Sequence, residues 1–186
     1  MGKVVILTDD CNNVVDRIVT EALTLGPEPI AFVCVDPEGM EINWSTLERI
    51  NTELPRSDYF IVFTGGTQRV VNAHLKKGTH SKSLRSFTGL DDVESLTLSG
   101  KDLFDTYQGK IQADLGKTIG EFVPIKDGRG QDIYKILLFV RPTRGGAPFF
   151  GGYRAMFSRL RGVGVDDVKR ALDILKRGQS TLETAQ

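Results

Sequence analysis

The stretch Tyr59-Phe60-Ile61-Val62-Phe63-Thr64-Gly65-Gly66-Thr67 joins five apolar residues to a short turn of threonine and glycine. An unbroken run of β-branched and aromatic residues is typical of a strand that is covered on both faces of a sheet. The two glycines indicate a tight turn, and apolar residues at helical spacing follow until Gly78. We therefore interpret this stretch as a strand, a turn and the start of a helix.

Two similar units precede it. Residues 3–8 and 30–35 are short apolar runs, and each is followed by apolar residues at helical spacing, up to Gly26-Pro27 and Pro55 respectively. Three strands that alternate with three helices predict a parallel sheet with right-handed crossovers, in which residues 3–8 are the central strand. We expect an α/β fold with a Rossmann-like layer and an irregular connection in residues 1–115.

The second half of the chain has a different pattern. Its apolar runs surround an Asp127-Gly128 turn, which predicts an antiparallel hairpin. Residues 116–186 are expected to form this hairpin and a basic helical region, packed on the first part as one domain. The expected elements are strands at 119–125 and 133–140, a loop at 142–152 and helices at 153–160 and 166–176.

Length and composition favour a folded, cytoplasmic protein. A chain of 186 residues with 40% hydrophobic content can bury a core. It contains no apolar run of about 20 residues, which a membrane-spanning helix needs, and its start does not have the layout of a secretory signal. Cys11 and Cys34 lie next to or inside predicted strands, so we interpret both as buried structural thiols.

The carboxyl ends of the predicted strands are the place to expect a ligand, because helix N-termini point their free N–H groups outward there. At the third strand end, two glycines allow the backbone to approach an anion closely, and threonine hydroxyls can donate hydrogen bonds. The alternative is a tight structural turn capped by Thr67. The expected ligand-binding residues are Thr8, Asp9, Asp10, Asp36, Thr64, Gly65, Gly66, Thr67, Gln68 and Arg69.

Residues 58–68 resemble the strand, turn and helix start of CARF domains, the CRISPR-associated Rossmann-fold sensors of cyclic oligoadenylates. One branch of that family has a Thr-Gly-Gly-Thr-Lys run that contacts the ligand. Gln68 stands here where the family has lysine, and Val62 stands where asparagine is common. The resemblance implies binding of a nucleotide or cyclic oligonucleotide, and a symmetric ligand of this kind would suit a homodimer.

The acidic side chains at the strand ends allow an enzymatic alternative. Carboxylates from Asp9, Asp10, Asp36 and Glu38 could share Mg²⁺ in a nuclease or phosphodiesterase. The simpler interpretation is that the first two cap a helix and the third begins a turn. No zinc site, dinucleotide cofactor or other cofactor is predicted, because the ligand spacings and the glycine-rich fingerprint are missing.

Charge is distributed unevenly along the chain. Residues 1–60 carry 4 basic and 11 acidic side chains, whereas residues 126–186 carry 12 basic and 6 acidic ones. Arginines beside aromatic residues in the basic half could bind single-stranded RNA or DNA by phosphate contact and base stacking. The alternatives are attraction between the two halves or between subunits, and a solvated loop. The candidate nucleic-acid-binding residues are Arg141, Arg144, Phe149, Tyr153, Arg154 and Arg159.

Overall fold

A computed structural model describes residues 3–64, 73, 77, 81–91, 103–127, 129–142 and 148–161. Its elements in chain order are α1 (Cys11–Leu23), β1 (Ala31–Val35), α2 (Trp44–Glu53), β2 (Ser57–Thr64), α4 (Ser81–Thr88), α6 (Leu103–Leu115), β3 (Thr118–Lys126), β4 (Asp132–Val140) and α7 (Pro148–Arg161). The expected third helix lies outside these residues except at 73 and 77, and the expected helix at 166–176 lies wholly outside them.

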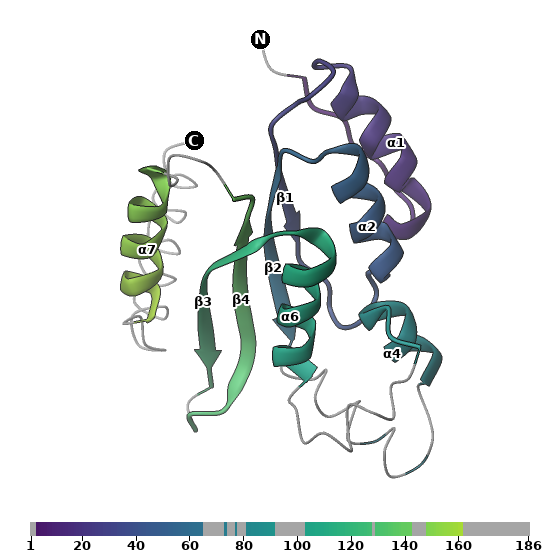
Figure 1. Cartoon of the computed structure of the whole chain (residues 1–186). Helices are drawn as coiled ribbons and strands as arrows, with labels where there is room; N and C mark the ends of the chain where they lie inside the picture. Colours follow the sequence, from purple (N-terminus) through teal and green to yellow (C-terminus); the bar gives the residue numbers. More distant parts are fainter. Residues whose placement is uncertain are drawn as a thin grey trace, which may run out of the picture.

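The four strands form one mixed sheet in the order β1-β2-β4-β3 (Figure 1). β1 and β2 run parallel, while β4 lies antiparallel to both β2 and β3. The predicted α/β class, the parallel pair and the antiparallel hairpin are therefore confirmed. The hairpin does not sit apart from the first half of the chain, because β4 pairs directly with β2.

The prediction that residues 3–8 form the central strand is wrong. β2 has β1 on one side and β4 on the other, so the place expected for this strand is occupied by the hairpin. Residues 3–8 lie outside the sheet, and Val4 and Ile6 are 86% and 84% exposed. Two of the three expected parallel strands therefore pair with each other.

One face of the sheet is covered by helices α2, α4 and α6 (Figure 1), and we refer to it as the helix-covered face. Alternate residues of β2 point into it, because successive side chains of a strand face opposite sides. Among them, the ring of Phe63 lies 5.8, 5.4 and 5.8 Å from the rings of Phe87, Phe104 and Tyr107. This aromatic cluster lies in the larger of the two cores.

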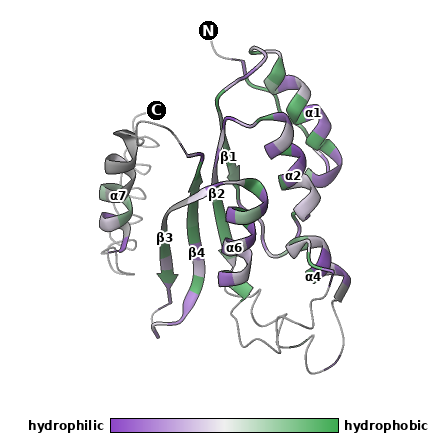
Figure 2. Ribbon diagram, in the orientation of Figure 1, coloured by the Kyte–Doolittle hydropathy of each residue, from purple (hydrophilic) through white to green (hydrophobic). Residues whose placement is uncertain are grey.

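The other face is covered unevenly. At β3 and β4, Phe157 of α7 is fully buried with Val123, Leu138 and Val140 in a smaller core. At β1 and β2 the side chains of Phe32, Phe60 and Val62 remain exposed or half-buried, and Phe32 is 55% exposed. We refer to this second region as the open face. Apolar residues, coloured green in Figure 2, run through all four strands.

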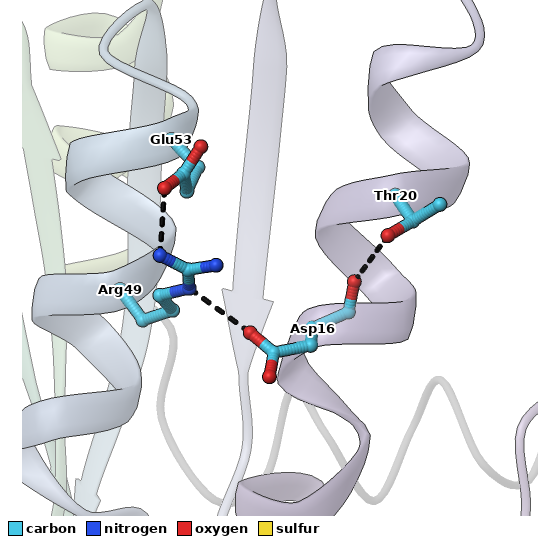
Figure 3. A network of polar contacts seen from close by, with 4 residues as sticks. All are labelled: Asp16, Thr20, Arg49 and Glu53. Atoms are coloured by element: carbon cyan, nitrogen blue, oxygen red, sulfur yellow. Dashed lines mark hydrogen bonds and ion pairs between the residues drawn. The ribbon is translucent and has the colours of Figure 1, made fainter.

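Helices α1 and α2 are joined by polar contacts (Figure 3). Arg49 of α2 donates to Asp16 of α1 at 2.9 Å and to Glu53 of its own helix at 2.7 Å. Thr20 donates to the backbone carbonyl of Asp16 at 2.7 Å. Since these side chains are largely exposed, each ion pair contributes at most about 1 kcal/mol. Of the contacts in Figure 3, the Arg49–Asp16 pair is the one that connects the two helices.

Several elements differ from expectation. Helices α4 and α6 lie in a stretch for which the pattern indicated little, because glycines and polar residues interrupt its apolar spacing. Helix α7 begins at Pro148 within the expected loop, since proline lacks the N–H group that the first turn of a helix leaves unpaired.

The prediction of buried thiols is also wrong, since Cys11 and Cys34 are both exposed. Cys34 belongs to β1, which is an edge strand among the described residues rather than an internal one. In the described part of the chain, no helix has the length and apolar content needed to cross a membrane.

Candidate functional site

The carboxyl ends of β1 and β2 lie at the same edge of the sheet. The two strands are parallel neighbours, and Val35, the last residue of β1, pairs with Ile61 of β2. Asp36 therefore leaves the sheet on the side toward which Thr64 ends β2. This edge is where ligands bind in open α/β sheets.

A hollow of about 670 Å³ lies at this edge. It is lined by residues from all four strands or the loops that follow them: Asp36, Pro37, Glu38, Val62, Ile125, Tyr134 and Ile136. Its size falls within the range of small-molecule sites, which is roughly 300–1,000 Å³.

The walls of the hollow differ in chemistry. Val62, Ile125 and Ile136 provide an apolar floor, and the ring of Tyr134 is 43% exposed beside them. Asp36 and Glu38 are exposed, and their carboxylates can accept hydrogen bonds from hydroxyl groups. The hollow can hold a flat apolar ring with a hydroxyl-bearing group next to it.

The sheet register places Tyr134 beside the end of β2. Tyr134 of β4 pairs with Thr64, the last residue of β2. Thr64 is 7% exposed, and the sequence continues from it with Gly65-Gly66-Thr67. Residues 65–69, which include Gln68 and Arg69, lie outside the described residues.

Thr8, Asp9 and Asp10 lie before α1 and do not line the hollow. Asp10 is the N-cap of α1, and its carboxylate accepts a hydrogen bond from the backbone N–H of Asn12 at 2.8 Å. Asp9 accepts one from the backbone N–H of Asp10 at 2.7 Å. The simpler interpretation of Asp10, a helix cap, is confirmed.

Asn12 is a positioning residue that the sequence did not reveal. Its side-chain amide donates to the carbonyl of Glu41 at 2.7 Å. Its oxygen accepts hydrogen bonds from the backbone N–H of Asn43 at 2.8 Å and from the hydroxyl of Thr46 at 2.7 Å. These bonds attach the N-terminus of α1 to the loop that follows β1, so they help to hold Asp36 and Glu38 at the sheet edge.

The carboxylates proposed for a magnesium site do not gather. Asp9, Asp10, Asp36 and Glu38 all belong to the described residues. Among the described residues, no group of three or more histidine, cysteine, aspartate or glutamate side chains lies close enough together to hold a metal ion. The structure therefore gives no support to the metal-dependent nuclease.

The candidate nucleic-acid-binding residues are only partly placed. The guanidinium of Arg141 donates to the carbonyl of Arg56 at 2.6 Å, and its backbone N–H donates to Asp58 at 2.9 Å. Arg159 is exposed on α7. Arg144 and the side chains of Phe149, Tyr153 and Arg154 lie outside the described residues. RNA or DNA binding through this region stays a prediction.

Several residues of the hollow were not predicted from the sequence. Alternation along β4 places Tyr134 and Ile136 on one face, and the hairpin register pairs Ile125 with Tyr134. Those signals are local. The pairing of β4 with β2, which brings them to Asp36, is a long-range contact that the apolar pattern does not encode.

We compared the chain with protein-family models, with curated proteins and with solved structures, and none of them matches.

Proposed function

We propose that the chain binds a nucleotide at the carboxyl edge of β1 and β2, with a Rossmann-like use of the strand ends. The observation that carries this proposal is the hollow between Asp36 and Tyr134, directly beside the end of β2. The base would lie against Tyr134 and the apolar floor. A ribose hydroxyl would donate to Asp36 or Glu38.

The phosphate end of the ligand would reach the Thr64-Gly65-Gly66-Thr67 run. Thr64, the last residue of β2, pairs with Tyr134, which lines the hollow. The glycines that follow Thr64 in the sequence allow an anion to approach the backbone closely. The exposed carboxylates of Asp36 and Glu38 would repel phosphate, so they favour the orientation with the ribose toward β1. The resemblance to CARF domains extends the candidate ligands to cyclic oligoadenylates, with a homodimer around a two-fold symmetric ligand.

The experiment is a thermal-shift and calorimetric titration with adenosine, adenosine monophosphate and cyclic oligoadenylates. Binding should raise the melting temperature by mass action. Tyr134→Ala should weaken binding by roughly tenfold, since base stacking on an aromatic ring contributes about 1–3 kcal/mol. Asp36→Asn should weaken the binding of all these ligands, because each of them contains a ribose.

Ile133→Ala is the matched control, because Ile133 and Tyr134 are adjacent in β4 and both are 43% exposed, yet their side chains point to opposite faces. Equal effects of the two substitutions, or no stabilisation by any of these ligands at millimolar concentration, would refute the proposal.

A further inference from the structure

The outer edge of β1 has no partner strand among the described residues, since β1 pairs only with β2. Natural sheets protect such an edge with lysine, proline, a bulge or a covering segment. Ala31–Val35 contains neither lysine nor proline, and all five of its residues are apolar. This edge is therefore suited to accept another strand.

A groove of about 670 Å³ runs along this edge, between β1 and the helices α1 and α2. α1 contributes Cys11, Ile18 and Ala22, and every residue of β1 lines the groove as well. Its surface is mostly apolar, so leaving it in water is unfavourable. Residues 3–8 are not among those that line it.

Residues 3–8 have the composition of a buried strand but are mostly exposed. Val4, Val5, Ile6 and Leu7 are consecutive, so both sides of a strand made from them would be apolar. Val4, Val5 and Ile6 are all exposed. The segment thus has apolar surface to bury, and the groove does as well.

The direction of the segment matches that of β1. Lys3 donates to Glu21 near the end of α1 at 2.7 Å, and Asp10 caps the start of α1, so the segment runs antiparallel to α1. β1 also runs antiparallel to α1, because Glu41, in the loop that follows β1, contacts Asn12 at the start of α1. The segment and β1 therefore run in the same direction (Figure 1).

The lengths match as well. The 13 residues of α1 span roughly 20 Å at about 1.5 Å each, and six residues in a strand span roughly 20 Å at about 3.3 Å each. Residues 3–8 can thus lie along the whole groove without a change in α1. α1 packs against α2, as a crossover helix of a second parallel pair would.

The charge of the N-terminal part of the chain favours residues 3–8, rather than a second copy of the chain, as the partner of the outer edge of β1. Residues 1–60 carry 11 acidic and 4 basic side chains, so two copies joined at this edge would repel each other. The segment itself brings Lys3, which already pairs with Glu21.

We propose that residues 3–8 dock on the outer edge of β1 as a fifth strand, parallel to β1, and fill the groove between β1 and α1. The structure records the undocked arrangement. Docking closes the sheet edge and moves Thr8 toward Asp36, so it couples the N-terminus of the chain to the carboxyl edge of the sheet. The proposal goes beyond nucleotide binding and does not depend on it.

Disulfide trapping in the full chain tests the docking. Cys11 is replaced by serine, which leaves Cys34 of β1 as the sole native thiol. Single cysteines are then placed at positions 4, 5, 6 and 7, one per variant, and oxidised with oxidised glutathione. Neighbouring strands lie about 4.8 Å apart, which a disulfide can bridge when both side chains are on one face.

The expected result is an intramolecular disulfide at one position only, that of the residue directly opposite Cys34, because the next residue on the same face lies roughly 8 Å from Cys34, beyond the reach of a disulfide. Equal cross-linking at all four positions, or at none, would overturn the proposal. Cross-links between two molecules would overturn it in favour of a second copy.

Amide hydrogen exchange gives a readout without cysteine variants. The backbone amides of residues 5–7 should exchange at least about tenfold more slowly in the wild-type chain than in a peptide of the same sequence. Exchange at the same rate as in the peptide would show that the segment stays undocked.

Discussion

The two faces of the sheet differ in how they are covered, although alternate residues of the same strands form them. On the helix-covered face, Tyr59, Ile61 and Phe63 of β2 are buried beneath three helices. On the open face, their neighbours Phe60 and Val62 stay half-buried. The first face holds the fold together, and the second leaves apolar surface beside the strand ends, where we propose that a ligand binds.

A tyrosine on each face shows the same contrast. Tyr107 is buried within the aromatic cluster, its hydroxyl has no hydrogen-bond partner among the described residues, and burial raises the pKa of this hydroxyl. Tyr134 on the other face is 43% exposed. One tyrosine serves packing, and the other remains accessible to a ligand.

The largest expected effect is the loss of a ring from the helix-covered face. Phe63→Ala removes ring contacts to Phe87, Phe104 and Tyr107 and leaves a cavity. The free energy of unfolding should fall by about 3–5 kcal/mol, as measured by urea denaturation. A loss below about 1 kcal/mol would show that this face does not dominate stability.

Gly89→Ala tests how closely the helices pack on the same face. Gly89 follows α4 with a φ of +64°, and a methyl group there would collide with the indole of Trp44. The positive φ costs about 1 kcal/mol and the collision about 1–3 kcal/mol, so we expect a loss of about 2–4 kcal/mol. Thermal unfolding with calorimetric analysis measures it.

Gly109→Ala is the control for this substitution. Gly109 is an exposed residue of α6, and a methyl group there meets no atom within 4 Å. Alanine should stabilise this helix by about 0.5–1 kcal/mol. Similar losses for both glycines would mean that contact with Trp44 is not the cause.

The sequence predicted the helix-covered face better than the open face. The apolar residues at helical spacing before Pro55 are Trp44, Leu47, Ile50 and Leu54, and all four are buried. A helix encodes this side in its own spacing. The insertion of β4 beside β2 depends on contacts between residues 70 to 80 positions apart, such as Tyr59 with Phe139, and no local pattern carries that information.

For the same reason, only part of the candidate site could be predicted from the sequence. Asp36 follows a recognisable strand, so its place at a strand end could be expected. Tyr134 and Ile125 reach the hollow only through the order of strands in the sheet. Thr8 was misplaced because the apolar run before it predicted a strand that the sheet does not contain.

Lys117 is a buried charged residue beside Tyr59, and it gives a smaller, pH-dependent effect. Its ammonium donates to the carbonyls of Ser57 and Pro55 at 2.8 and 3.3 Å, and it lies 5.5 Å from the ring centre of Tyr59. Lys117→Met leaves these carbonyls without this donor and should destabilise the chain by about 1–3 kcal/mol. Lys126→Met, at an exposed lysine of β3, should change little.

Burial lowers the pKa of Lys117 below its ordinary value of 10.5, and the charge of Arg141 adds to this while Asp58 opposes it. Between the lowered pKa and 10.5, the unfolded chain binds more protons than the folded chain. Stability relative to Lys117→Met should therefore rise as pH increases through this interval. Urea denaturation at a series of pH values checks the slope, and a decrease with pH would contradict it.

The smallest expected effect lies on the open face, at Phe32. Its side chain is 55% exposed, and its ring has one described aromatic neighbour, Phe60, at 6.5 Å between centres. Because burying a phenylalanine fully contributes about 1.5–3 kcal/mol, Phe32→Ala should cost about 1 kcal/mol or less. Phe63→Ala is the matched comparison, since it removes the same atoms from the other face. A similar loss for both would mean that another part of the chain, such as docked residues 3–8, or a partner covers Phe32 in solution.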